Sequence, residues 1–230
     1  MTTIAQQIAV LHAQIAEIAG KAGRDPRDIT LMAVTKNHPE AAVIAAAEAG
    51  ITCFGENRVG EAIGKYRDPD LQKNLHMIGH LQSNKVAKAV GLFSWIDSVD
   101  SRKLAGKLAA AAERQNRRLQ LLLEINVSGE DAKYGFIEEE EAFETLEFMA
   151  ASQWLIPRGF MTIGPLHGGP RETADAFVRL RRIHEKAQSL YSDLNLDTLS
   201  MGMSGDWDMA IQEGSTMIRL GTAIFGARTP

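Results

Sequence analysis

Residues 29–36 read ITLMAVTK, a short apolar run that ends on a lysine. A run of this length and composition is typical of a buried β-strand. Pro39 stands where it can open a helix, and the alanine-rich residues after it continue to Gly50, a common helix stop. We therefore predict a strand over residues 29–35, with Lys36 at its end, and a helix over residues 40–49.

The same alternation of strand and helix runs through the rest of the chain. It predicts strands over residues 51–54, 75–78, 93–97, 119–125, 157–161, 197–200 and 217–220, and helices over residues 57–66, 83–89, 101–116, 138–151, 171–191 and 205–213. Such alternation favours parallel strands joined by crossover helices. Eight of these strands can close without leaving an edge, so we predict an α/β fold, a (β/α)8 TIM-type barrel. A doubly wound open sheet is the alternative fold.

The chain of 230 residues has the usual length of one barrel domain, and no Pro/Gly/Ser-rich linker divides it. We therefore predict a single domain over residues 1–230. The first 22 residues are expected to form an extra helix packed on the barrel, because apolar residues recur there at roughly helical spacing: Ile4, Val10, Leu11, Ile15 and Ile18.

The composition excludes several classes of function. A net charge of -4 gives no basic surface for nucleic acid, and no apolar run is long enough to span a membrane. The N-terminal residues lack the pattern of a secretory signal, and the single cysteine, Cys53, has no partner in the chain for a disulfide. We expect a cytoplasmic protein with a buried, non-catalytic thiol at Cys53.

Lys36 is the first candidate site residue. Functional groups of such barrels gather at the carboxyl ends of the strands, and polar residues follow nearly every predicted strand here. An apolar strand delivers Lys36 to this end, where partial loss of water favours the uncharged, nucleophilic amine. The alternative is an ordinary surface lysine.

Two loops on the last two strands indicate an anion site. Residues 200–204 read SMGMS, and Gly221 and Thr222 follow the eighth strand. Barrels often hold phosphate between these loops, although plain loop glycines would look the same. Arg219 lies inside the last strand, where a buried guanidinium needs either a core carboxylate or a ligand atom as its partner. His76 and His80 lack the pattern of a zinc site, so no metal is predicted.

Six segments together resemble the pyridoxal 5'-phosphate (PLP) homeostasis protein family. They extend in family order through most of the chain and comprise residues 33–36, 54–59, 76–85, 126–130 with Lys133 and Gly135, 199–204 and 214–226. The resemblance implies a fold-type-III PLP barrel similar to the N-terminal domain of alanine racemase. The sequence departs from the family pattern at Leu75, Phe160 and Gly164. The last two leave the pocket wall near the sixth strand in question.

The resemblance also assigns roles to residues. Lys36 would carry PLP as a Schiff base, Arg219 would face the pyridine nitrogen, and Asn57 would lie beside the ring. Ser200, Ser204, Gly221 and Thr222 match the positions that hold the phosphate. An arginine cannot give up a proton to the pyridine nitrogen, so it would weaken the electron sink without abolishing it.

Two functions remain open at this point. The first is a non-catalytic carrier that buffers, protects or delivers PLP and so influences amino-acid and keto-acid balance, with PLP-dependent apoenzymes as candidate receivers. The second is a weakly active racemase-like enzyme. The chain ends at Pro230, soon after the last strand, so we expect neither the second domain nor the dimer of the racemases, and we predict a monomer. Tyr134 is the one candidate for a second acid/base. Lys85 and Lys133 are alternative transient PLP sites, with surface lysines as the simpler interpretation.

Overall fold

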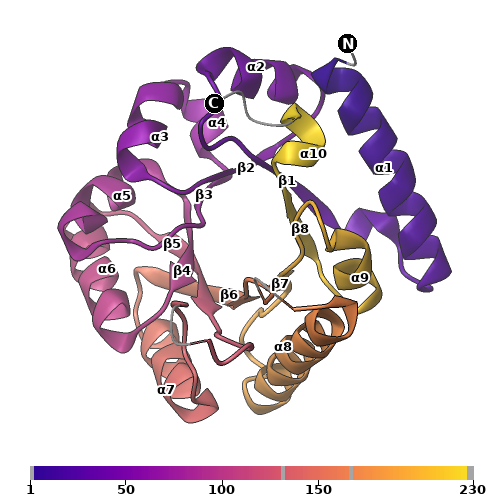
Figure 1. The fold of residues 1–230 in the computed structure, drawn as a ribbon. Helices are drawn as coiled ribbons and strands as arrows, with labels where there is room; N and C mark the ends of the chain where they lie inside the picture. Colours follow the sequence, from indigo (N-terminus) through magenta and orange to yellow (C-terminus); the bar gives the residue numbers. More distant parts are fainter. Residues whose placement is uncertain (1–2, 131–132, 166–167, 227–230) are drawn as a thin grey trace.

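The computed structural model describes residues 3–130, 133–165 and 168–226 (Figure 1). Eight parallel strands pair in chain order and the eighth returns to the first, so the sheet is a closed barrel. The strands are Thr30–Val34 (β1), Cys53–Glu56 (β2), Leu75–Met77 (β3), Trp95–Val99 (β4), Leu119–Glu124 (β5), Leu155–Met161 (β6), Thr198–Ser200 (β7) and Met217–Leu220 (β8). The predicted TIM-type barrel is confirmed, and the alternative of an open sheet is wrong.

Helices surround this barrel (Figure 1). They are Ile4–Lys21 (α1), Glu40–Glu48 (α2), Val59–Lys65 (α3), Pro69–Gln72 (α4), Val86–Leu92 (α5), Arg102–Arg114 (α6), Glu139–Ala150 (α7), Pro170–Leu190 (α8), Trp207–Gln212 (α9) and Thr222–Phe225 (α10), with 3-10 turns at Pro26–Asp28 (η1) and Ser83–Lys85 (η2). In the described part of the chain, no helix is long and apolar enough to cross a membrane.

Helix α1 completes the outer ring. Because α10 has only four residues, the helix after β8 is too short to cover the barrel wall, and α1 packs between α2 and α9 instead. Its buried face consists of Ile8, Leu11, Ile15 and Ala19. The predicted apolar stripe was wrong at Val10, which is 51% exposed. Ile8 and Ala19, rather than Val10, continue the buried face that Leu11 and Ile15 form.

The apolar core lies mainly between strands and helices, while the barrel interior is mixed. One small apolar cluster inside the barrel contains Met32, Val34, Cys53 and Met217, and a second contains Trp95, Leu122 and Met161. Gly55 leaves room for the first cluster, since a Cβ there would lie 2.6 Å from the Met32 sulfur. Cys53 is buried, as predicted.

Two strands end two residues later than the sequence predicts. β2 reaches Glu56 and β4 reaches Val99, so the carboxylates of Glu56 and Asp97 lie within strands and are fully buried. Asp97, predicted as the last residue of its strand, lies inside β4 instead and has a partner in the barrel in His76, at 2.9 Å.

Candidate cofactor-binding site

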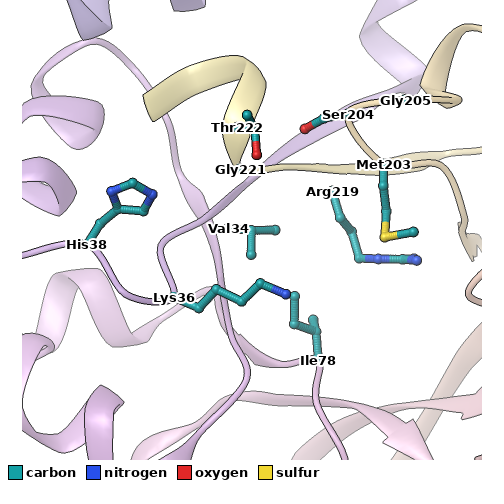
Figure 2. A pocket seen from close by; sticks show the side chains of 10 residues that line it. All are labelled: Val34, Lys36, His38, Ile78, Met203, Ser204, Gly205, Arg219, Gly221 and Thr222. Atoms are coloured by element: carbon teal, nitrogen blue, oxygen red, sulfur yellow. The ribbon is translucent and has the colours of Figure 1, made fainter. Parts of the chain in front are cut away.

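A cavity of about 280 Å³ opens at the carboxyl end of the barrel (Figure 2). It combines residues from the ends of β1, β3, β7 and β8, which the closed sheet brings to one place. Five of the seven predicted cofactor-binding residues line it: Lys36, Ser204, Arg219, Gly221 and Thr222. The other lining residues are Val34, His38, Ile78, Met203 and Gly205.

Lys36 lies two residues after the end of β1 and is half-buried. Its side chain extends across the pocket, and its Nζ lies near Ile78 on the far wall (Figure 2). Val34, two residues earlier on the strand, also lines the pocket. The end of β1 thus brings an apolar side chain and the Lys36 amine to the same pocket, as the run at residues 29–36 predicts.

Two loops come together at one side of the pocket. The Ser204 hydroxyl accepts a hydrogen bond from the Ala223 amide at 3.4 Å, which joins the loop after β7 to the turn after β8. Gly221 passes close to β1, because a Cβ at this position would lie 3.2 Å from the carbonyl oxygen of Val34. Two hydroxyls, of Ser204 and Thr222, and the backbone around Gly221 therefore face the same cavity (Figure 2).

Arg219 reaches into the pocket from β8 and is only 4% exposed. Its Nη1 donates to the Ser200 hydroxyl at 2.7 Å and its Nη2 donates to the Thr162 carbonyl at 2.6 Å. Burial lowers the pKa of the guanidinium from its usual value, while Asp97, Glu124 and Asp206 act in the opposite direction. These two bonds use two of the five N–H donors of a guanidinium, so the group retains donor capacity for a ligand atom.

A polar layer lies beneath Arg219 inside the barrel. Burial would lower the pKa of His76, but the nearby carboxylate of Asp97 outweighs it and raises the pKa to about 10. Burial, together with the negative charge of Asp100, raises the pKa of Glu124 to about 7, although Arg219 opposes this shift. The carboxylates that act on the Arg219 guanidinium therefore include Glu124, whose charge changes near neutral pH.

Two predicted residues lie outside the pocket lining. Ser200 is fully buried on β7 and contacts Arg219, so any effect of Ser200 on a ligand would pass through the guanidinium. Asn57 lines a neighbouring cavity, and its main chain packs against Gly79, where a Cβ would lie 2.6 Å from the Asn57 carbonyl oxygen.

The sequence missed His38, Ile78 and Met203 as lining residues. The His38 ring packs at a tilt of 35° against the Phe225 ring, with centroids 4.6 Å apart, a contact between the loop after β1 and helix α10. Because helix α10 was not predicted, the sequence could not indicate that His38 and Phe225 would meet. Ile78 was predicted as the end of the third strand, and an apolar residue at a strand end gives no indication that it faces a pocket.

Several residues singled out from the sequence lie at the rim. His80 bonds to Asp100 at 2.9 Å and stacks on Tyr134, whose residue is 56% exposed. Lys133 donates to Ser128, Glu130 and the Gly164 carbonyl, and Lys85 lines the same neighbouring cavity as Asn57. In the described residues, no three His, Cys, Asp or Glu side chains are grouped as a metal site.

Comparison with known proteins extends over the whole chain. The family model for the alanine racemase N-terminal domain matches residues 7–229. The pyridoxal phosphate homeostasis protein of Pseudomonas aeruginosa PAO1 is 43% identical over 239 residues, which cover 99% of this chain and 97% of that protein. The chain belongs to the pyridoxal phosphate homeostasis protein family.

Solved structures of other proteins also resemble this chain. PipY of Synechococcus elongatus PCC7942, solved with PLP bound, has a TM-score of 0.85 at 39% identity, covering 97% of this chain and 100% of PipY. Alanine racemase of E. faecalis shares the fold at 20% identity, with a TM-score of 0.66 over 93% of this chain and 58% of the racemase.

The departures from the homeostasis-family pattern lie away from the pocket lining. Leu75 and Phe160 are buried in the main core, and the Phe160 ring packs on His184 of helix α8, with centroids 5.9 Å apart. Gly164 lies where a Cβ would be 3.3 Å from the Asp206 carboxylate and close to Phe177. We conclude that the changes at Leu75 and Phe160 alter packing behind the strands, whereas Gly164 lies beside Asp206 in the loop after β6.

Proposed function

We propose that this protein binds PLP through Lys36 as a Schiff base and serves intracellular PLP homeostasis as a carrier. The observation that carries the proposal is the shared pocket of Lys36, Arg219 and the two loops that contain Ser204 and Thr222. A relative 39% identical to this chain was solved with PLP bound, which supports the choice of ligand.

The residues of the pocket match the chemistry of PLP. Its volume of about 280 Å³ lies near the lower end of the roughly 300–1,000 Å³ range of ligand pockets. Gly221 would let backbone N–H groups approach a phosphate, since its missing side chain leaves the space beside Val34 open. Ser204 and Thr222 would add hydroxyl donors, and Arg219 would donate to an unprotonated pyridine nitrogen.

When bound, PLP supplies an aldehyde that an amine can hold covalently. Lys36 would hold that aldehyde, and the apolar side chains of Val34 and Ile78 would limit the access of water to the amine. Ser200 would act by orienting Arg219, to which it is hydrogen-bonded. We retain Asn57 as a predicted residue of the site, acting from the adjoining cavity.

A carrier role is favoured over turnover by the position of Tyr134. Racemisation needs a second acid/base on the face opposite the lysine. Tyr134 stacks on His80 at the rim, and in the described ranges no tyrosine lines the pocket. We propose a cytoplasmic monomer that hands PLP to PLP-dependent apoenzymes.

The PLP proposal is tested by an absorbance titration of the purified full-length protein with PLP. A band should rise at roughly 420 nm, where PLP Schiff bases absorb, and Lys36→Ala should abolish it. Lys85→Ala is the matched control, because Lys85 lies at the rim and should leave the band unchanged. A band that survives Lys36→Ala would contradict the assignment.

The carrier role has its own test. The PLP-loaded protein is incubated with L-alanine in deuterated water, and α-deuteration and D-alanine are measured by mass spectrometry and chiral chromatography. We expect neither product to exceed the level of free PLP under the same conditions. Sustained turnover above that level would establish the racemase-like alternative.

A further inference from the structure

The backbone on both sides of Lys36 is held by one partly buried ion pair on helix α3. Lys65 Nζ donates to the Thr35 carbonyl oxygen at 2.6 Å, and Glu61 Oε1 accepts from the Asn37 amide at 2.5 Å. The two side chains are themselves joined at 2.5 Å, one helical turn apart. A single i,i+4 pair therefore contacts the peptide group before Lys36 and the peptide group after it.

This arrangement fixes the direction of the Lys36 side chain. Peptide groups are planar, so the two planes that meet at the Lys36 Cα define its φ and ψ. Holding one plane by its carbonyl and the other by its amide restricts both angles and thus the direction of the Cα–Cβ bond. The next residue, Asn37, has a φ of 63°, in the left-handed region that non-glycine residues seldom adopt, so the turn needs such support.

The pair is anchored in a buried network rather than on a mobile surface. Lys65 also donates to Glu56 at 3.0 Å, and the Thr35 hydroxyl bonds to both Glu56, at 2.7 Å, and Tyr66, at 2.6 Å. The Lys65 side chain is 10% exposed and that of Glu56 is fully buried. Although burial alone would raise the pKa of Glu61, its bonds to Lys65 and the Asn37 amide hold the pKa below its usual value.

We propose that Lys65 and Glu61 are positioning residues, which hold Lys36 in the orientation that captures PLP. Neither residue lines the pocket of Lys36, although Glu61 lines the neighbouring cavity with Asn57; both act on the main chain around Lys36. The inference rests on the proposed function for its ligand, but the geometry at Lys36 can be measured without PLP.

The PLP-free measurement is the rate at which Lys36 is acetylated by a small amine-reactive ester, followed by mass spectrometry with Lys85 as the internal reference. In Glu61→Leu and Lys65→Met the half-buried Lys36 should be released toward solvent, so its rate relative to Lys85 should rise several-fold. In Glu61→Gln, which retains an acceptor oxygen, the relative rate should lie between those of wild type and Glu61→Leu. In Lys65→Arg it should stay close to the wild-type rate. Equal relative rates in all variants would overturn the inference, whether or not the protein binds PLP.

The second measurement is PLP affinity and release, followed by the absorbance band of the full chain. Glu61→Leu and Lys65→Met should bind PLP roughly ten-fold more weakly and lose it faster, because small misplacements of a reacting group are costly. Leu180→Ala is the stability control: it removes a buried side chain from α8, across the barrel from α3 (Figure 1), and should lower the melting temperature without changing affinity. If Glu61→Leu and Lys65→Met bind PLP within about two-fold of wild type, the positioning role is rejected. If Lys36→Ala lacks the band in the same experiment, the proposed function still stands.

Lys65→Met can fail to fold, because Glu56 then loses its cation. In that case Glu61→Leu decides the question, since the Glu61 side chain is 21% exposed and Lys65 keeps Glu56 as its partner.

Discussion

Arg219 and its neighbours illustrate what single residues contribute to this site. The sequence left the partner of Arg219 open between a core carboxylate and a ligand atom. The structure shows a third solution, in which the Ser200 hydroxyl and the Thr162 carbonyl accept from the guanidinium while three carboxylates act on it at longer range. The cation is therefore held by the protein before any ligand binds.

Glu124 gives a prediction on the pH dependence of stability. Its pKa in the folded protein is raised to about 7, so the folded state binds a proton that the unfolded state has lost above its ordinary pKa of 4.5. Stability from this group is present at low pH and is lost as the pH rises toward 7. The free energy of unfolding of wild type, relative to Glu124→Gln, should fall by about 2 kcal/mol between about pH 5 and pH 7.5.

Urea denaturation of both proteins across this range measures the difference, and the comparison cancels the other titrating groups. A difference that stays flat, or that grows with pH, would show that Glu124 titrates near its ordinary value.

At the residue scale, the sequence could predict Lys36 and the loop residues because they follow predicted strands of a barrel, and Arg219 because a guanidinium inside a strand needs a partner. It could not predict the Lys65–Glu61 pair, which reads as an ordinary helical ion pair. Nor could it place Ser200 behind Arg219, because a strand residue beside a loop gives no indication of its depth.

At the scale of elements, strand β6 shows where pattern reading stops. It begins at Leu155, two residues before the predicted start at Pro157, although a proline is typical of the first residue of a strand. The pairing with β5 shifts here, with Leu121 opposite Pro157 and Leu122 opposite Gly159, so Arg158 is an extra residue in the ladder. Such a bulge accommodates the proline within the sheet.

Gly159 carries the prediction at this scale. Its φ is 140°, and a Cβ would lie 1.9 Å from the Thr198 carbonyl oxygen on β7. Gly159→Ala should therefore lower the free energy of unfolding by about 3 kcal/mol or more, through strain and overpacking. Gly106→Ala is the matched control, since a methyl group there would have no neighbour within 4 Å and helix α6 should gain about 0.5–1 kcal/mol. Chemical denaturation of both variants gives the comparison; similar values would refute the close contact.

At the scale of the whole molecule, α1 takes the place in the outer ring that α10 leaves open. The sequence predicted the helix and its packing on the barrel, but the shortness of α10 decides where it packs. The sequence predicted no helix after the last strand, so it could not indicate that a helix of only four residues would leave this place open.

Ile15 tests the contribution of this helix. It is 3% exposed against the barrel wall, whereas Val10 on the same helix is 51% exposed. Ile15→Ala should lower the free energy of unfolding by roughly 2–5 kcal/mol, and Val10→Ala should change it by less than about 0.5 kcal/mol. Thermal and urea denaturation measure both. Equal effects would mean that α1 does not form part of the packed ring.

Lys36 is the lysine of this chain that we propose to hold PLP. The most direct test is to load the protein with PLP, reduce it with borohydride so that the C=N bond becomes a stable amine, and map the modified peptide by mass spectrometry. We expect one added pyridoxyl phosphate group, on Lys36. A label on Lys85 or Lys133, or no label at all, would contradict it.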